Sequence, residues 1–342
     1  SAANAILFFA EKPIVGQTTH IGFAKTTIVD SDVCFDVVDN GNNGVYIYIS
    51  LNKTKVNIGT IVAKSGVAQD VKIKETNKRI DKLNPFKGKV IVNFGDSIIG
   101  NPRGTNPDVD NPISNLLAER LEAVCYNAGF GGCQMATHQS EAWDAFSMHS
   151  LADSINSGNW SVQDAAIESY NQTFINAGVT YFSQTLEMLK GIDWQRVDYI
   201  TISYGTNDFA VNVPLTDENA ANVYDAYIGA LKYSVEKILS VYQHIKIIVT
   251  PPIWRCWLSS GEVINDSDEK SNSNGNKLTD FVAAISEVCN EMHIVSVDLY
   301  HSLGFNRLTR VYYFGNADGT HPNQKGRNLM ADRICGQLRS LY

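Results

Sequence analysis

The chain has 342 residues, of which 44% are hydrophobic and 19% charged, and its formal net charge is −8. This length is sufficient for two domains with a sizeable core, and the composition is ordinary for a globular protein. The acidic balance, and the lack of a long basic run or a membrane-length apolar run, argue against nucleic acid or a membrane as the main partner.

Six cysteines are scattered along the chain without a CxxC pair, so we expect neither a zinc site nor a redox motif. No metal and no cofactor are expected on these grounds. Most of the cysteines are expected to be small core residues. A disulfide bridge between Cys125 and Cys133 stays open, as does the redox compartment.

Residues 1–69 are expected to form a β-rich accessory domain. The runs 26–29, 33–38 and 45–51 are rich in β-branched and aromatic residues, and residues 39–44 have the chemistry of a turn. Several short strands without helices predict a small sandwich-like domain. Its tyrosines suit stacking on sugars, as in a carbohydrate-binding module. The alternative is a structural spacer whose tyrosines cover a sheet.

Residues 70–86 are predicted to form a charged helical linker. Ile73, Thr76, Ile80 and Leu83 have the a/d spacing of a coiled coil, over about two heptads. Helices this short are marginal alone, so association would need contacts between the β domains as well. We expect a homo-oligomer held through the N-terminal region, and the β-branched a positions are compatible with a trimer. The alternative is that this seam packs against the chain's own C-terminal domain.

Residues 87–342 alternate apolar runs of strand length with amphipathic stretches of helix length, which predicts a parallel, doubly wound α/β sheet. The expected strands are 90–94, 124–126, 199–203, 245–249 and 293–297, and the expected helices lie within 113–124, 219–242, 278–288 and 323–341.

An insertion with little strand character covers residues 133–176. It carries several aromatic or large side chains, namely Trp143, Phe146, Met148, His149 and Trp160. The insertion is expected to form either one wall of a substrate cleft or a satellite core, the more usual outcome.

Four polar or glycine-rich clusters stand out, three of them at the ends of predicted strands. They are Gly95-Asp96-Ser97, Asn127–Gly132, Gly205–Asp208 and, near the end of the chain, Asp318–Pro322. The carboxyl ends of the strands are where open α/β sheets build their sites. Four such clusters are more than turn chemistry requires, although each alone is compatible with a turn or a helix cap.

With these four blocks in order, the chain resembles the SGNH (GDSL-like) hydrolases over about residues 88–342, in the manner of a carbohydrate esterase. The resemblance implies a flavodoxin-like three-layer topology for the predicted sheet, and the activity of a serine ester hydrolase. The arrangement of β domain, short helix and hydrolase is similar to modular proteins of phage tails and gut-bacterial polysaccharide systems. A secreted or virion-associated location is therefore favoured.

Ser97 is the candidate nucleophile, since a serine hydroxyl attacks an ester once a base takes its proton. His321 is the candidate base, and Asp318, three residues earlier, is placed to orient the imidazole and stabilise its cation. A plain turn at Asp318 is the structural alternative. The order Ser, Asp, His also occurs in α/β-hydrolases, but Ile98-Ile99 follows the serine, so their G-x-S-x-G elbow is absent.

The resemblance also implies three hydrogen-bond donors for an oxyanion hole. They are the backbone N–H of Ser97, a backbone N–H from the glycine run, and the side-chain amide of Asn207. The family's Asn-Ala-x-x-x-Gly pattern assigns the glycine to Gly132, with Gly131 as the fallback. Asp96 and Asp208 are expected to organise their loops through backbone hydrogen bonds.

We therefore expect a serine esterase that removes small acyl groups, above all acetyl, from a carbohydrate. The appended β domain and the aromatic insertion favour a sugar over a lipid. Arg103 is a further candidate, either for a substrate anion or sugar hydroxyl or as a loop cap. The alternatives are a lipid or thioester acyl hydrolase of the same fold, and a non-catalytic carbohydrate-binding or adhesion protein.

Overall fold

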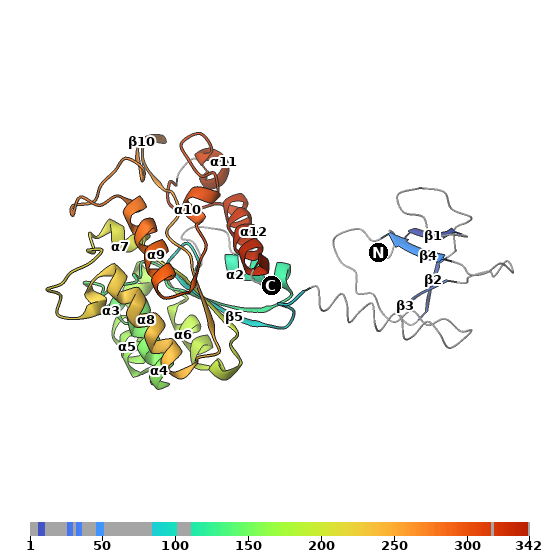
Figure 1. Ribbon diagram of the computed structural model, residues 1–342, viewed down its shortest axis with the longest axis horizontal. Helices are drawn as coiled ribbons and strands as arrows, with labels where there is room; N and C mark the ends of the chain where they lie inside the picture. The colour runs from blue at the N-terminus through green and yellow to red at the C-terminus, as the bar shows by residue number, and fades with distance from the viewer. Residues whose placement is uncertain are drawn as a thin grey trace. The chain divides into compact units, whose positions relative to one another are not determined.

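The computed structural model describes residues 84–100, 111–315 and 318–340, together with four strands nearer the N-terminus (Figure 1). The chain divides into two compact units, Ser1–Leu83 and Asn84–Tyr342. The seam of the predicted linker helix and the candidate residue Arg103 lie outside the described residues. The domain boundaries predicted at residues 69 and 86 stay predictions.

The first unit contains two antiparallel strand pairs. β1 (Ile6–Ala10) pairs with β4 (Tyr46–Ser50), and β2 (Thr26–Val29) pairs with β3 (Asp32–Phe35). β3 and β4, which flank the predicted turn at 39–44, thus pair with different strands and not with each other. The sandwich-like packing of these pairs stays a prediction.

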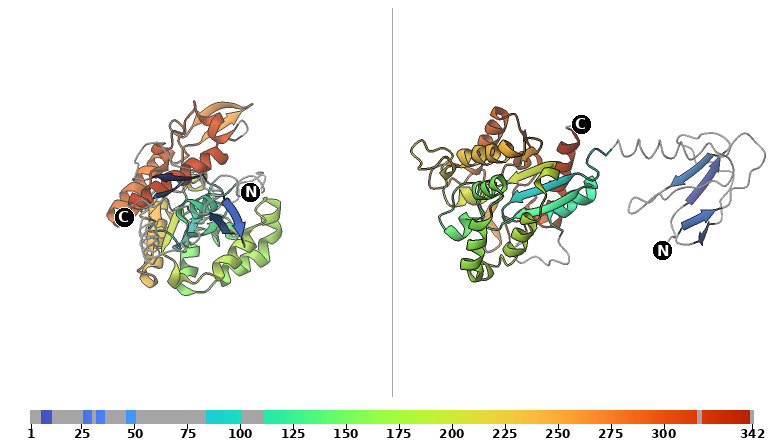
Figure 2. Two further views of the ribbon diagram at one scale, coloured as in Figure 1. Left: turned by 90° about the vertical axis from the view of Figure 1, so that its right-hand side faces the viewer. Right: turned by 90° about the horizontal axis from the view of Figure 1, so that it is seen from below.

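The second unit is built on a five-stranded parallel sheet (Figures 1 and 2). Along the sheet its order is β11-β8-β7-β5-β6, the flavodoxin-like order, and this confirms the predicted three-layer α/β fold. Because the chain reverses direction across the sheet after β6, the topological switch point lies between the carboxyl ends of β5 and β7. The strands are β5 (Val90–Gly95), β6 (Val124–Gly129), β7 (Tyr199–Ser203), β8 (Lys246–Val249) and β11 (Val295–Ser296).

The central strand β5 is buried along almost its whole length, as its apolar run predicts. Asn93 is its polar exception and is only 1% exposed. Thr201 in β7 donates to Asn93 Oδ1 over 2.9 Å, and Asn93 Nδ2 donates to the Tyr126 carbonyl in β6 over 3.2 Å. A satisfied polar side chain thus ties β5 to both of its neighbours.

Helices cover both faces of the sheet (Figure 1). α2 (Ile113–Leu121) and α12 (Gln324–Ser340) pack side by side on one face. α6 (Phe182–Lys190), α8 (Tyr227–Val241) and α9 (Leu278–Glu291) lie on the other, as right-handed crossovers require. Each turns its apolar stripe towards the core.

The predicted insertion is helical and consists of α3 (Glu141–Asp144), α4 (Met148–Ser157) and α5 (Ser161–Asn176). α4 packs against α8. The insertion shares an aromatic cluster with the segment after β6 and with α6, so most of its rings form core. The rings of this cluster are Phe130, Phe146, Phe174 and Phe182.

Two predicted elements are shorter than expected. The helix predicted from residue 219 begins at Tyr227, because Asn222 and Asp225 close a capping box on a separate short turn and Ala226 has extended backbone. The fifth strand shrinks to β11, since His293 has a φ of 55° that a strand does not allow.

One hairpin was not predicted, β9 (Cys256–Ser259) with β10 (Glu262–Asp266), which follows β8 after two prolines. The remaining short elements are η1 (Trp194–Arg196), α7 (Thr206–Ala210), η2 (Val223–Asp225), α10 (Leu299–Ser302) and α11 (Arg310–Phe314).

Candidate active site

Ser97 lies in a tight turn directly after β5. The turn is closed by the backbone N–H of Gly100, which donates to the Asp96 carbonyl over 2.9 Å, and by that of Ile98, which donates to Asp96 Oδ1 over 2.9 Å. Gly95 is required before it, because a Cβ there would lie 2.8 Å from the Ser203 carbonyl oxygen. Ser97 is half-buried while both of its neighbours are buried, so the turn presents this hydroxyl to the surface.

The His321 side chain reaches Ser97 from the loop before α12. Its Nε2 lies 2.9 Å from Ser97 Oγ, and its Nδ1 lies 2.8 Å from Asp318 Oδ2. A carboxylate at Nδ1 keeps the proton there, so Nε2 is left as the acceptor for the serine proton. The structure thus brings together the three residues that the sequence proposed as nucleophile, base and orienting acid.

Asp318 is held in its ionised form. Burial raises the pKa of its carboxyl, but hydrogen bonds from the His321 ring and the Thr320 backbone N–H outweigh this and lower the pKa to about 2. The loop itself is anchored by the Cys256 N–H, which donates to the Gly319 carbonyl over 2.8 Å. An ionised carboxylate on a fixed loop suits the stabilisation of an imidazolium.

The chain contains a second Asp-x-x-His pair with the same local geometry. His301 Nδ1 lies 2.8 Å from Asp298 Oδ2, and the His301 backbone N–H also donates to that aspartate. In the described residues no serine hydroxyl bonds to His301. Contact with Ser97 therefore distinguishes the His321 pair.

Gly132 lies on a turn beside the nucleophile. Its φ is +85°, and an added Cβ would lie 2.8 Å from Trp143 Nε1. Its backbone N–H has no hydrogen-bond partner among the described residues, whereas the N–H of Gly131 already donates to Tyr181 Oη over 3.1 Å. A free donor is what an oxyanion needs, so the geometry favours Gly132 over Gly131.

Asn207 approaches the same turn from the start of α7. Its Nδ2 donates to the Cys133 carbonyl, directly after Gly132, over 2.9 Å. An amide carries two N–H donors, so one remains for an oxyanion. The Ser97 backbone N–H is also without a partner in the described part of the chain. The three proposed donors therefore belong to loops that converge on the serine.

Asp96 and Asp208 act as predicted, by accepting backbone hydrogen bonds. Asp208 is fully buried and accepts from the N–H groups of Met135 and Ala136, each at 3.0 Å. This fixes the segment after Gly132. Burial raises the pKa of Asp96 to about 6, against the lowering effect of the Ile98 N–H. Burial likewise raises the pKa of Asp208 to about 7, against the lowering effect of the Ala136 and Met135 N–H groups.

A family model for GDSL-like lipases and acylhydrolases matches residues 94–329, a span that contains every one of these site residues. The chain belongs to the GDSL-like lipase/acylhydrolase family. It is a serine ester hydrolase of the SGNH type, as the four sequence blocks predicted.

Solved structures share the fold of this acylhydrolase. One crystal structure is 23% identical with a TM-score of 0.52, covering 74% of this chain and 97% of its own. A protein from Lactobacillus plantarum is 18% identical with a TM-score of 0.51, covering 75% and 99%. A possible lipase from Chitinophaga pinensis is 19% identical with a TM-score of 0.46, covering 74% and 98%. No curated protein matches the chain.

Three residues near the site of the acylhydrolase were not predicted as site residues. Trp143 Nε1 donates to the Gly131 carbonyl over 3.0 Å, and Tyr181 receives the N–H of the same glycine. Arg255 donates from Nη1 to Thr206 Oγ1, next to Asn207, over 3.2 Å. Trp143 was noted only as part of the insertion. Tyr181 and Arg255 lie in no motif, so no sequence signal pointed to them.

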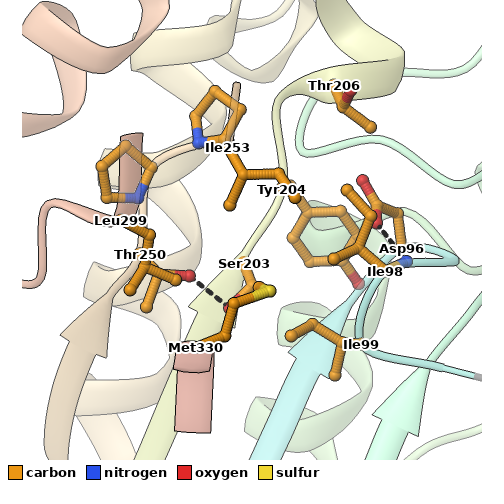
Figure 3. A pocket seen from close by; sticks show the side chains of 12 residues that line it. Asp96, Ile98, Ile99, Ser203, Tyr204, Thr206, Thr250, Ile253, Leu299 and Met330 are labelled. Carbon is orange, nitrogen blue, oxygen red and sulfur yellow. Dashed lines mark hydrogen bonds between the residues drawn. The ribbon is translucent and has the colours of Figure 1, made fainter. Parts of the chain in front are cut away.

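A small cavity of about 20 Å³ lies behind the nucleophile turn of the acylhydrolase (Figure 3). It has room for one water molecule and is too small for a substrate. Figure 3 shows Asp96, Ile98 and Tyr204 on one side of it and Thr250 with Ser203 on another.

Cys125 and Cys133 are free thiols in the acylhydrolase, so the bridge left open by the sequence is not formed. Among residues 84–100, 111–315 and 318–340, no group of three His, Cys, Asp or Glu side chains is arranged to hold a metal ion. Of the described helices, none is long and apolar enough to cross a bilayer.

Proposed function

We propose that this acylhydrolase removes small acyl groups, above all acetyl, from the hydroxyls of a carbohydrate through an acyl-enzyme on Ser97. The observation that carries the proposal is the chain of contacts from Ser97 Oγ to His321 and on to Asp318, at 2.9 and 2.8 Å. Two further donors, the Gly132 backbone N–H and the second N–H of Asn207 Nδ2, have no hydrogen-bond partner among the described residues.

In the proposed reaction, Ser97 Oγ attacks the ester carbonyl carbon while His321 Nε2 takes its proton. The carbonyl oxygen becomes an oxyanion and accepts hydrogen bonds from the Ser97 and Gly132 backbone N–H groups and from Asn207 Nδ2. The intermediate then expels the sugar alkoxide, which takes the proton from His321. Water, activated by the same imidazole, releases the acid and restores the serine.

Crowding beside Ser97 supports a short acyl group. A Cβ at Gly131 would lie 3.7 Å from Ser97 Cβ, 2.9 Å from Tyr181 Oη and 3.0 Å from Val179 Cγ1. Trp143 crowds the next residue, because a Cβ at Gly132 would lie 2.8 Å from its Nε1. On the β6 side of the serine these side chains leave little space, which suits acetyl better than a long chain.

The carbohydrate part of the proposal rests on the two tyrosines of β4, whose sequence is YIYIS. Tyrosine combines an apolar ring with a polar tip, and this suits a sugar surface.

The test is a chain-length series with para-nitrophenyl acetate, butyrate and octanoate, followed by acetate release from a panel of acetylated glycans. We expect the highest kcat/KM for acetate and release of acetate from at least one glycan. A preference for octanoate would support a lipid acyl hydrolase instead. No release of acetate from any glycan of the panel would contradict the carbohydrate part of the proposal.

A further inference from the structure

Two cations flank one tryptophan near the active site. Arg255 Cζ lies 4.9 Å from the centre of the Trp257 ring, and Lys270 Nζ lies 4.1 Å from it. Both distances are within the range of a cation–π contact. These three residues are called the Arg255 cluster below. The Trp257 indole thus contacts two positively charged side chains at the start of the β9 hairpin.

The Arg255 cluster adjoins the catalytic loops. Arg255 Nη1 bonds to Thr206, which directly precedes the proposed oxyanion donor Asn207. The next residue, Cys256, holds the loop of Asp318 and His321 through the Gly319 carbonyl. The Arg255 charge acts on both Asp96 and Asp318. The guanidinium therefore lies where the loops after β5, β7 and β8 meet.

Within the described part of the chain, the two cations have no carboxylate in ion-pair contact. Neither Arg255 nor Lys270 forms an ion pair with a carboxylate of the described residues, whereas Lys89, Lys232 and Arg307 all do. Arg255 Nε is moreover buried and has no hydrogen-bond partner among those residues. A buried donor without an acceptor is costly, and a guanidinium carries five donors in a fork that matches a carboxylate.

The Arg255 cluster lies on one side of Ser97, and the side chains of Trp143 and Tyr181, which crowd the space beside the serine, lie on the other. In the strand order β11-β8-β7-β5-β6, the Trp143 and Tyr181 wall stands at the β6 side of β5. Arg255 follows β8 and bonds beside β7, on the other side. A substrate whose small acyl group lay against this wall would have its alcohol part on the side of the cluster.

We propose that Arg255 and Lys270 bind a carboxylate on the alcohol part of the substrate, so that the substrate is an O-acylated acidic saccharide. This inference rests on the proposed function, because an acetyl group carries no anion and the charge must belong to the alcohol. A carboxylate is recognised edge-on by the guanidinium and further attracted by the ammonium group.

The test compares two acetyl esters of the same shape, para-acetoxybenzoate and the neutral para-acetoxybenzamide. Each kcat/KM is divided by the rate at which hydroxide hydrolyses that ester, which removes the difference in leaving group. We expect the wild type to favour the anionic ester by about tenfold at low ionic strength, on the order of one charge-assisted contact. Added sodium chloride should reduce this ratio, because salt screens a partly exposed charge.

Variants of Arg255 and Lys270 show whether these two side chains cause the preference for the anionic ester. Arg255→Gln and Lys270→Gln should each lower the ratio of anionic to neutral rates towards one. The matched control is Lys232→Gln, which removes the same charge from a distant lysine paired with Glu291 at 2.6 Å, and it should keep the wild-type ratio. If Arg255→Gln does not fold, the Lys270→Gln variant is the deciding measurement. Lys270 is only half-buried, so replacing it leaves no buried polar group without a partner.

A wild-type ratio of one or less, or an unchanged ratio in Lys270→Gln, would overturn the inference. The proposed function stays intact after such a result, provided that both acetyl esters are hydrolysed and that Ser97 is required for the hydrolysis. Failure to turn over either acetyl ester, with activity on octanoate, would overturn the proposed function itself.

Discussion

Asn207 Nδ2 donates to the Cys133 carbonyl oxygen over 2.9 Å, and this contact joins the start of α7 to the turn that carries Gly132. One amide thus uses one N–H to hold the turn and keeps the other for substrate. The proposed oxyanion hole is therefore a set of two loops that fix each other, and loss of one donor should also loosen the second.

Asn207→Ala should lower kcat for an acetyl ester by about 10²–10³-fold with little change in KM, as for the loss of one oxyanion donor. Steady-state kinetics with para-nitrophenyl acetate measure this. Asn156→Ala is the control, because Asn156 Nδ2 also donates to a carbonyl, that of Lys237 over 2.8 Å, away from the site. A rise in KM with kcat unchanged would show that Asn207 binds ground-state substrate instead.

Gly132→Ala should reduce kcat by more than about tenfold, since a Cβ at φ +85° strains the backbone and meets Trp143 Nε1 at 2.8 Å. Gly158→Ala is a matched control. Its φ is +69°, and an added Cβ meets nothing within 4 Å. It should lose stability, by about 1–2 kcal/mol, but not kcat. Equal kcat in the two variants would remove Gly132 from the oxyanion hole.

Asp318→Asn should reduce activity less than His321→Ala, because the acid orients the base while the base carries the proton. The second Asp-x-x-His pair supplies the control, since Asp298→Asn removes the same negative charge from beside His301 and should not affect kcat. Equal losses in Asp318→Asn and His321→Ala would show that the acid is as indispensable as the base.

The pKa of Asp318, about 2, also predicts a pH dependence of stability. A folded-state pKa below the ordinary value of about 3.8 means that this carboxylate stabilises the fold above about pH 4, and that the contribution is lost as pH falls towards 2. Urea unfolding of Asp318→Asn should therefore differ most from the wild type near neutral pH. A difference that persists unchanged at about pH 2 would contradict this.

The pH dependence of stability that Asp208 predicts has the opposite sign. Burial raises its pKa to about 7, so the folded protein holds a proton that the unfolded chain releases near its ordinary pKa of 3.8. Its contribution to stability is fully present below about pH 4 and is lost as pH rises through about 7. The amide introduced by Asp208→Asn cannot ionise, so the stability deficit of this variant relative to wild type should shrink between about pH 4 and 7. Urea unfolding across this range measures the deficit, and a deficit that grows would contradict the raised pKa.

The sheet could be predicted because its strands are continuous apolar runs that end in polar clusters. Val90–Gly95 and Tyr199–Ser203 are of this kind, and both are buried on the two faces of a parallel sheet. The β9–β10 hairpin escaped prediction, since its short strands are mixed in character and pair only with each other. Short hairpins of this type depend on tertiary context.

Ser97, Gly132, Asn207 and His321 could be proposed because each lies in a block of specific residues at a predicted strand end or loop. Arg255 could not, since its position near Thr206 depends on how the segment after β8 folds over α7. Tyr181 is similar. Its contact with Gly131 joins residues 50 positions apart, across the whole helical insertion, and no local pattern records this.

The most direct test of the account is to measure para-nitrophenyl acetate hydrolysis by Ser97→Ala beside the wild type, with Ser140→Ala, an exposed serine, as the control. The same samples are treated with a fluorophosphonate and their intact masses recorded. We predict that Ser97→Ala loses at least about 10³-fold in kcat and takes up no label, while the wild type and the control are labelled once. Hydrolysis by Ser97→Ala at a rate near that of the wild type would contradict the serine mechanism.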